Sequence, residues 1–185
     1  MTDWDEPMLK RHNVVAARDA VVHLWQKPAL DDALARMPDA ERAILCGPLP
    51  AWVPVRVPVQ LGHAVWEGPV GRDKARYHAY LHRQTDMTTG RIRKALLGLA
   101  KPERIFAQAP AMWRSEHTAG TLEASVEGKS GVVVLRDHPY VESPQGRAAI
   151  AETFRYIVEL SRAKGATETH AFIAPSAVEV KLRWL

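Results

Sequence analysis

Residues 143–185, SPQGRAAIAETFRYIVELSRAKGATETHAFIAPSAVEVKLRWL, carry the pattern that decides the fold. Ser143 is a favourable helix N-cap, and Pro144 suits the first helical position because its missing N–H would be unpaired there anyway. Apolar side chains then recur at helical spacing through residues 150–158, and Gly165 is a typical helix stop. The stretch therefore begins with one long amphipathic helix.

Strand signals flank this helix on both sides. After the glycine stop, residues 167–173 are rich in β-forming side chains, residues 174–176 indicate a turn, and residues 178–184 alternate apolar and charged. Upstream, residues 122–135 form two alternating runs around the Gly-Lys-Ser-Gly turn at residues 128–131. The predicted order is strand, strand, helix, strand, strand.

We therefore predict an α+β fold, with a helical N-terminal part followed by a four-stranded antiparallel sheet and a helix packed on it. Proline-rich residues 46–58 interrupt the helical part, since four prolines there exclude a continuous helix. Residues 1–12 are expected to form a flexible tail, and residues 13–185 a single α+β domain.

Composition favours an ordinary globular protein in a reducing compartment. The 185 residues are 46% hydrophobic and 25% charged, and no apolar run approaches the roughly 18 residues of a membrane span. The start of the chain lacks the apolar core of a signal peptide. Cys46 is the only cysteine, so no internal disulfide can form, and we expect it to be a small buried residue. A cytoplasmic location is predicted.

Basic residues are concentrated in the middle of the chain. Residues 72–104 hold nine Lys and Arg against three Asp and Glu, while the whole chain carries +4. Such a stretch can bind nucleic acid, yet it is more often the solvated surface of helices. No nucleic-acid-binding motif accompanies it. Nucleic-acid binding through Arg72 to Arg104 is therefore the last of three functional hypotheses.

No catalytic motif is present, so we predict no catalytic residues and no enzymatic activity. The sequence contains neither a glycine-rich phosphate loop, nor a Gly-x-Ser-x-Gly nucleophile elbow, nor a set of paired cysteines. The best chemical candidate is the pair His78 and His82, which lie four apart on a predicted helix and could share a metal or haem iron. The alternative is that both are surface histidines beside Arg76 and Arg83.

The segment from Trp113 to His117 joins the helical part to the sheet. Large aromatic side chains at such a junction can line a pocket for an apolar ligand, although they are more often part of the core. The candidate ligand-binding residues are Tyr77, His78, His82, Trp113 and His117; no set of metal ligands is complete.

Several short motifs, in order, resemble one family. They are Trp52-Val53-Pro54, a helix from Tyr77 to Arg83, Ala95-Leu96-Leu97-Gly98-Leu99, Lys101-Pro102-Glu103, Pro110-Ala111-Met112-Trp113-Arg114, a strand start at Gly120 and a strand end at Trp184. This order resembles an uncharacterised family of myxobacterial paralogues, a domain of unknown function. That family is distantly similar to the ligand-binding fold of vinyl-reductase-like sensors, haem nitric-oxide sensors and Golgi-transport subunits.

The resemblance implies a regulatory module that binds small hydrophobic molecules or protein partners. The chain departs from the sensors in lacking the Tyr-x-Ser-x-Arg haem-propionate signature, whose nearest counterpart is residues 113–117, and in lacking cysteines near the last strands. The first hypothesis is therefore a non-enzymatic sensor or regulatory module for a small apolar ligand or a protein partner. A metal- or haem-binding protein using His78 and His82 is the alternative. A homodimer through the last strand is a further expectation.

Overall fold

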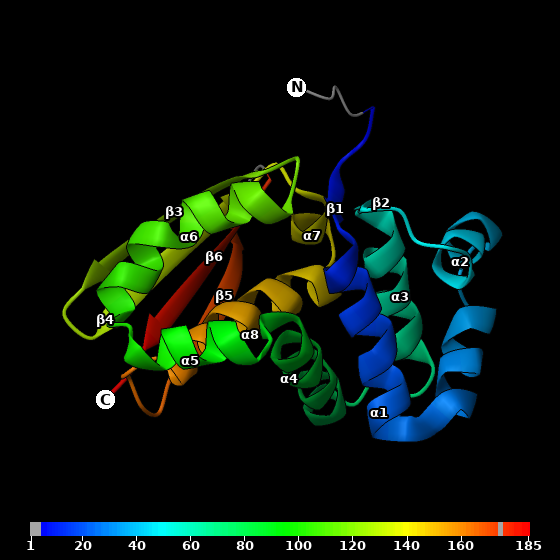
Figure 1. The fold of residues 1–185 in the computed structure, drawn as a ribbon, viewed down its shortest axis with the longest axis horizontal. Helices are drawn as coiled ribbons and strands as arrows, with labels where there is room; N and C mark the ends of the chain where they lie inside the picture. The colour runs from blue at the N-terminus through cyan, green and yellow to red at the C-terminus, as the bar shows by residue number, and fades with distance from the viewer. Residues whose placement is uncertain (1–4, 174–175) are drawn as a thin grey trace. The chain divides into compact units, whose positions relative to one another are not determined.

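The computed structural model describes residues 5–173 and 176–185 (Figure 1). Its contacts divide the chain into two compact units, Met1–Thr88 (unit 1) and Thr89–Leu185 (unit 2). The prediction that residues 13–185 form a single domain stays a prediction. No helix of the described residues is long and apolar enough to cross a membrane.

Unit 1 is built mainly of helices. Its elements are β1 (Met8–Lys10), α1 (Arg11–Ala35), α2 (Asp39–Cys46), β2 (Trp52–Pro54), α3 (Arg56–Glu67) and α4 (Lys74–Thr89). The strands β1 and β2 pair antiparallel, with Leu9 opposite Val53. Both of these side chains are buried, at 1% and 0% exposure.

The pairing of β1 with β2 corrects the expected tail. Residues 8–12 are an ordered strand and the start of α1, because Leu9 and Val53 remove each other from water. The tail prediction for residues 1–4 lies outside the described residues. The proline-rich crossing supplies β2, as an extended segment with Val53 facing the core.

Aromatic rings hold α4 in unit 1. Tyr80 stacks on Trp25 of α1, with ring centroids 6.4 Å apart, and Tyr77 meets Trp66 of α3 edge to face at 5.4 Å. The helix α1 is interrupted at Gln26, whose φ of 68° lies in the left-handed region two residues before Pro28. The break follows from that proline, which cannot donate a helical hydrogen bond.

Unit 2 contains the predicted sheet. Its elements are α5 (Arg91–Leu99), α6 (Pro102–Glu116), β3 (Thr121–Glu127), β4 (Ser130–Arg136), α7 (Pro139–Glu142), α8 (Pro144–Leu160), β5 (Thr167–Ile173) and β6 (Ala177–Arg183). The strands lie in the order β3-β4-β6-β5, and every neighbouring pair is antiparallel. The predicted α+β fold is confirmed.

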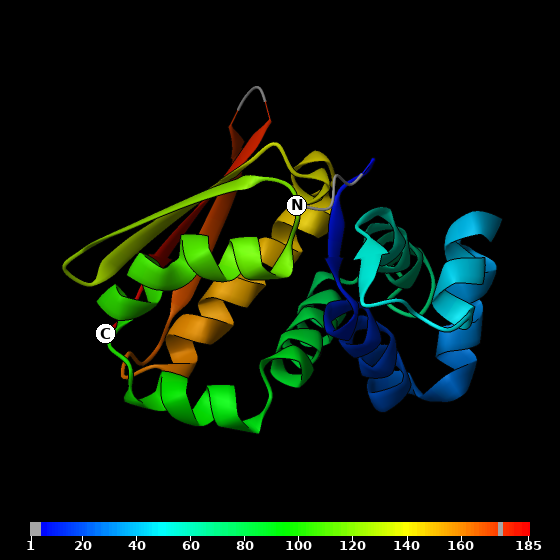
Figure 2. The same ribbon diagram turned by 45° about the horizontal axis from the view of Figure 1, so that its top comes forward.

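One face of the sheet forms the core of unit 2. Leu122, Leu135 and Val178 stand opposite one another on β3, β4 and β6, and all are buried. The helices α6 and α8 supply the other half of this core, with Phe106 and Phe154 among their buried residues (Figures 1 and 2). Alternation along the strands therefore sorts apolar side chains toward these two helices.

The helix α6 runs through Pro110, since buried residues before and after this proline anchor one continuous side of the helix. Two local expectations were wrong. Cys46 is exposed rather than buried, because it ends α2 on the side away from Leu45. The last strand, β6, lies between β4 and β5, so both of its edges are paired and it cannot pair across a dimer.

Candidate functional site

Four aromatic rings meet at one end of the β3–β4 hairpin. We call them the ring cluster: Trp113 and His117 from the end of α6, and His138 and Tyr140 from the connection between β4 and α8. The rings of Trp113 and His117 stack at 3.7 Å and 9°, while the ring of His138 stands nearly perpendicular to both, at 79° and 88°. All four residues belong to unit 2.

The hairpin places these rings together. Thr121 at the start of β3 lies opposite Arg136 at the end of β4, so the chain enters and leaves the hairpin at the same end. Asp137, with φ of 53°, then turns the chain, and its N–H donates to the Ser176 carbonyl at 2.9 Å. Gly120 must be glycine, because its φ is 80° and a Cβ there would lie 2.9 Å from the Cβ of His138.

Hydrogen bonds fix two of the four rings. The indole N–H of Trp113 donates to the Ala119 carbonyl at 3.0 Å. His138 is the N-cap of α7, and its Nδ1 accepts the backbone N–H of Tyr140 at 3.2 Å. Pro139 follows at the first position of the helix, where a proline is favoured. Both side chains therefore have one defined orientation.

His138 is held neutral. Burial, and secondarily the neighbouring His117, lower the pKa of His138 from 6.5 to about 3. Because its Nδ1 accepts a hydrogen bond, the single proton of the neutral ring lies on Nε2. This Nε2–H is buried and has no hydrogen-bond partner among the described residues. Burial also raises the pKa of the Tyr140 phenol well above its usual value.

An unpaired buried donor is the chemical feature of this cluster. Leaving such a group without an acceptor costs about 1–3 kcal/mol, so native proteins rarely tolerate it without a reason. A neutral imidazole with a pKa near 3 is a poor general base at neutral pH. The cluster is thus suited to bind an acceptor group among aromatic surfaces rather than to move protons.

The structure separates the residues singled out from the sequence. Trp113 and His117 belong to the ring cluster in unit 2. Tyr77 is buried in unit 1 against Trp66, whereas His78 and His82 are exposed on α4. In the described part of the chain, no three His, Cys, Asp or Glu side chains gather as a metal site requires.

Sequence reasoning missed His138 and Tyr140. Asp137-His138 and Glu116-His117 are adjacent pairs in the sequence, and adjacency alone predicts no contact between the two side chains. The available signal was the predicted hairpin, since residues just before its first strand and just after its second must emerge at the same end. That geometry brings His117 to His138, with ring centroids 5.2 Å apart.

Comparison with solved structures finds the fold of H-NOX proteins. The Fe(II) unliganded H-NOX protein from K. algicida matches with a TM-score of 0.64 and 11% identity, over 96% of this chain and 97% of that one. A single-site mutant of it matches at 0.68 with 9% identity over the same shares. An oxygen-binding H-NOX domain related to soluble guanylate cyclases matches at 0.55 with 10% identity, covering 92% of each chain.

At these identities the similarity shows the fold alone. No family model and no curated protein matches the sequence. The expected likeness to the fold of haem nitric-oxide sensors is confirmed, while membership of the myxobacterial family, and the likeness to vinyl-reductase-like sensors and Golgi-transport subunits, stay predictions.

The histidines of this chain do not fit a buried haem iron. His138 is the only fully buried one of the eight, and its Nε2 carries the proton while Nδ1 accepts from the backbone. His117 is half-buried against Trp113, and the other six are exposed. None of the four tyrosines is followed by serine two and arginine four positions later. We therefore derive no chemistry through haem.

Proposed function

We propose that this protein is a non-enzymatic sensor or regulatory module that binds a small, largely apolar ligand at the ring cluster. The observation that carries the proposal is the buried Nε2–H of His138, which lacks an acceptor in the described structure. The H-NOX fold supports it, because the solved neighbours include a domain described as binding oxygen.

The cluster defines the chemistry of the ligand. The rings of Trp113, His117 and Tyr140 offer apolar and π surface, and His138 offers one hydrogen-bond donor. A flat molecule with a single carbonyl or ether oxygen would satisfy that donor and cover the rings. His138 is only 3% exposed, so the ligand enters by displacing a neighbouring side chain.

Native mass spectrometry of freshly purified protein tests the proposal. We expect the chain mass plus a discrete small molecule, retained by the natural protein and lost in a His138→Asn variant. Asparagine keeps a side-chain acceptor for the Tyr140 N–H but cannot place a donor where Nε2 lies. A His82→Asn variant is the matched control and should retain the molecule. A bare chain mass for the natural protein would contradict ligand binding.

If the mass spectrum shows no bound small molecule, the proposal that remains is a regulatory module that binds a protein partner or a second copy of the chain. The same spectrum reads the oligomeric state directly. A mass of twice the chain would support the homodimer, for which β3 and β5 provide the edges of the four-stranded sheet.

Haem or metal binding through His78 and His82 is a second candidate. It is favoured by their exposure on α4, four residues apart, and by neighbours that contain Fe(II). Haem addition should then give a Soret band that His78→Ala and His82→Ala abolish and His138→Asn leaves intact. Absence of the band, with no transition metal by elemental analysis, would exclude this candidate.

Nucleic-acid binding through residues 72–104 ranks below both. Part of this charge is already engaged, since Arg72 pairs with Glu67 at 2.6 Å and Arg83 with Asp86 at 2.8 Å. The stretch also falls into both units of the chain. Salt-sensitive binding to generic DNA or RNA would support it, and no binding at low salt would exclude it.

A further inference from the structure

A second surface of unit 2 is independent of the ring cluster. Leu96 and Leu99 on α5 are 65% and 70% exposed, and Leu185 at the end of the chain is 81% exposed. Large exposed apolar side chains mark an interaction surface where they lie together. Both α5 leucines are left uncovered in the structure.

Backbone hydrogen bonds bring these leucines into one neighbourhood. The Ala100 carbonyl, directly after Leu99, accepts the Arg162 N–H at 3.2 Å. Two residues further, the Lys164 carbonyl accepts the Leu185 N–H at 2.9 Å. The ends of α5, α8 and the chain itself therefore meet in a single corner of unit 2.

Unpaired cations surround this corner. Six exposed basic residues lie close to these ends, Lys129 through the bond from the Trp184 N–H to its carbonyl at 3.2 Å: Lys101, Arg104, Lys129, Arg162, Lys164 and Arg183. We call them, together with Leu96, Leu99 and Leu185, the basic corner. None of the six makes an ion pair with any described residue; the exposed acids on the same segments are Glu103, Glu127 and Glu159, of which Glu159 pairs with Arg155.

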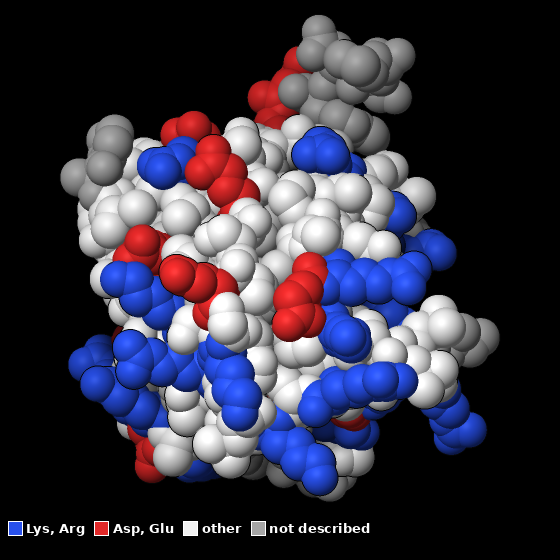
Figure 3. Space-filling model, turned by 90° about the vertical axis from the view of Figure 1, so that its left-hand side faces the viewer, with Lys and Arg blue, Asp and Glu red and all other residues white. Residues whose placement is uncertain are grey.

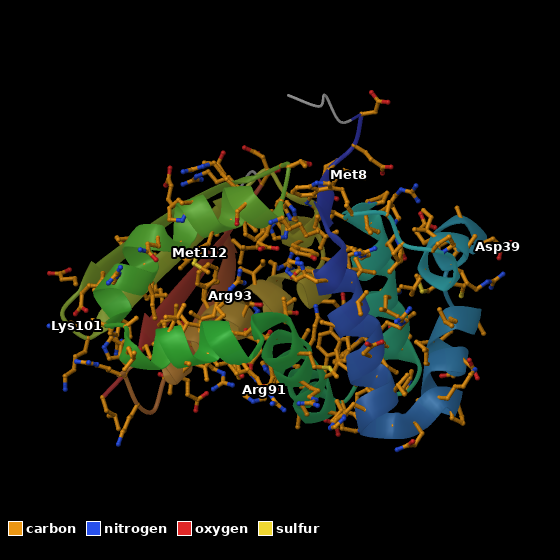
Figure 4. All side chains as sticks on the ribbon, viewed as in Figure 1. Met8, Asp39, Arg91, Arg93, Lys101 and Met112 are labelled. Atoms are coloured by element: carbon orange, nitrogen blue, oxygen red, sulfur yellow. The ribbon has the colours of Figure 1, made fainter. Side chains whose placement is uncertain are left out.

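The figures agree with this distribution. Figure 3 shows a face on which Lys and Arg side chains gather in the lower half with few acidic ones among them. Figure 4 labels Arg91 and Arg93 on α5 and Lys101 where α6 begins. Arg93 differs from the six, because it lies 3.6 Å from Glu116. The positive field of the corner therefore comes from the other side chains.

We propose that the basic corner docks on the surface of an anionic lipid bilayer. Leucines ringed by cations on the outer side of a helix are typical of helices that lie on such surfaces, where the apolar side chains enter the headgroup region and the cations meet lipid phosphates. The helix α5 packs mainly on α8 within unit 2, so its leucines lie on a convex side.

Two other occupants fit less well. A partner helix is normally held in an apolar groove, and the exposed side of a single helix is convex. Nucleic acid would engage the cations but leave three leucines in water, and the described corner has no exposed aromatic ring on which a base could stack.

Co-sedimentation of the full chain with vesicles tests the docking. We compare phosphatidylcholine vesicles with vesicles that also contain about 30% phosphatidylserine, and expect binding only to the second, weakening steeply with salt. Lys101→Gln and Arg162→Gln should each weaken partitioning about fivefold. The double variant Leu96→Gln and Leu99→Gln should weaken it at least about tenfold, since it removes the apolar insertion.

Matched controls keep the test decisive. Arg114→Gln removes a charge at the opposite end of α6, about 20 Å from Lys101 by helix geometry, and should leave partitioning unchanged. His138→Asn should also leave it unchanged, which separates this inference from the ligand proposal. Equal binding to both vesicle types, no binding, an Arg114→Gln effect equal to that of Lys101→Gln, or tighter binding to DNA than to vesicles would overturn the proposal.

Discussion

The two pairs of histidines in this chain behave in opposite ways. His78 and His82 lie four residues apart on α4 and remain exposed. His117 and His138 lie 21 positions apart, yet their rings meet in the ring cluster and His138 is buried. Residues four apart on a helix share one surface, and such a pair can be recognised from the sequence. A buried histidine with a shifted pKa arises here only where the fold brings distant segments together.

The largest expected contrast between the pairs is in stability. His138→Ala should lower the free energy of unfolding by about 3 kcal/mol, because it leaves a cavity among three rings and removes the cap on α7. Urea denaturation of both proteins measures the difference. A loss below about 1 kcal/mol would show that the cluster is loosely packed, against the ring contacts described here.

Acid should sharpen the contrast further. The folded state keeps His138 neutral down to about pH 3, whereas the unfolded chain takes up the proton below its ordinary pKa of 6.5. The free energy of unfolding is therefore unaffected by His138 above pH 6.5. It falls as the pH is lowered from 6.5 toward 3, and the loss due to His138 is about 2 kcal/mol at pH 5. Urea denaturation at pH 7 and pH 5 should show this fall in the free energy of unfolding. A His138→Asn variant, which has no imidazole to protonate, should show a fall that is smaller by about this amount.

A substitution at Trp113 tests whether the ring cluster is stabilised by the indole hydrogen bond or only by the size of the aromatic ring. Trp113→Phe keeps an aromatic surface against His117 but removes the indole N–H that donates to the Ala119 carbonyl. We expect a loss of about 1 kcal/mol in urea unfolding, close to the value of one hydrogen bond. An unchanged stability would mean that water replaces the indole at that carbonyl.

The smallest effect is expected on α4. His78→Ala and His82→Ala should each change the free energy of unfolding by less than about 0.5 kcal/mol, as for most exposed positions. The same urea experiment serves as the baseline for the buried pair. A loss of 2 kcal/mol or more at either position would remove the distinction between the two regions.

The fold was more predictable than the site. β-forming side chains after the Gly165 stop indicated β5, alternation indicated β6, and the Gly-Lys-Ser-Gly turn joined β3 to β4. The strand order β3-β4-β6-β5 was not predictable, because alternation fixes which face is buried but not which strands are neighbours. Strands of three residues, such as β1 and β2, are too short to show a period at all.

The site depended on contacts that no local pattern contains. Trp113 and His117 were candidates because they lie where the helical part joins the sheet, whereas His138 is noticed only once the hairpin brings its two ends together. Phe106 and Gly131 illustrate the same limit: the ring lies where a Cβ on the glycine would be, a fit that neither residue indicates alone.

The position of β5 at the edge of the sheet affects how the protein can be handled. Every second backbone N–H of this strand points to its outer side, where no strand of the described residues pairs with it. Most of its side chains are exposed, including Phe172 at 50%. The strand has no proline or lysine to discourage pairing with another chain. Its outward amides should exchange with deuterium sooner than those of β6, and aggregation at high concentration should begin at this strand.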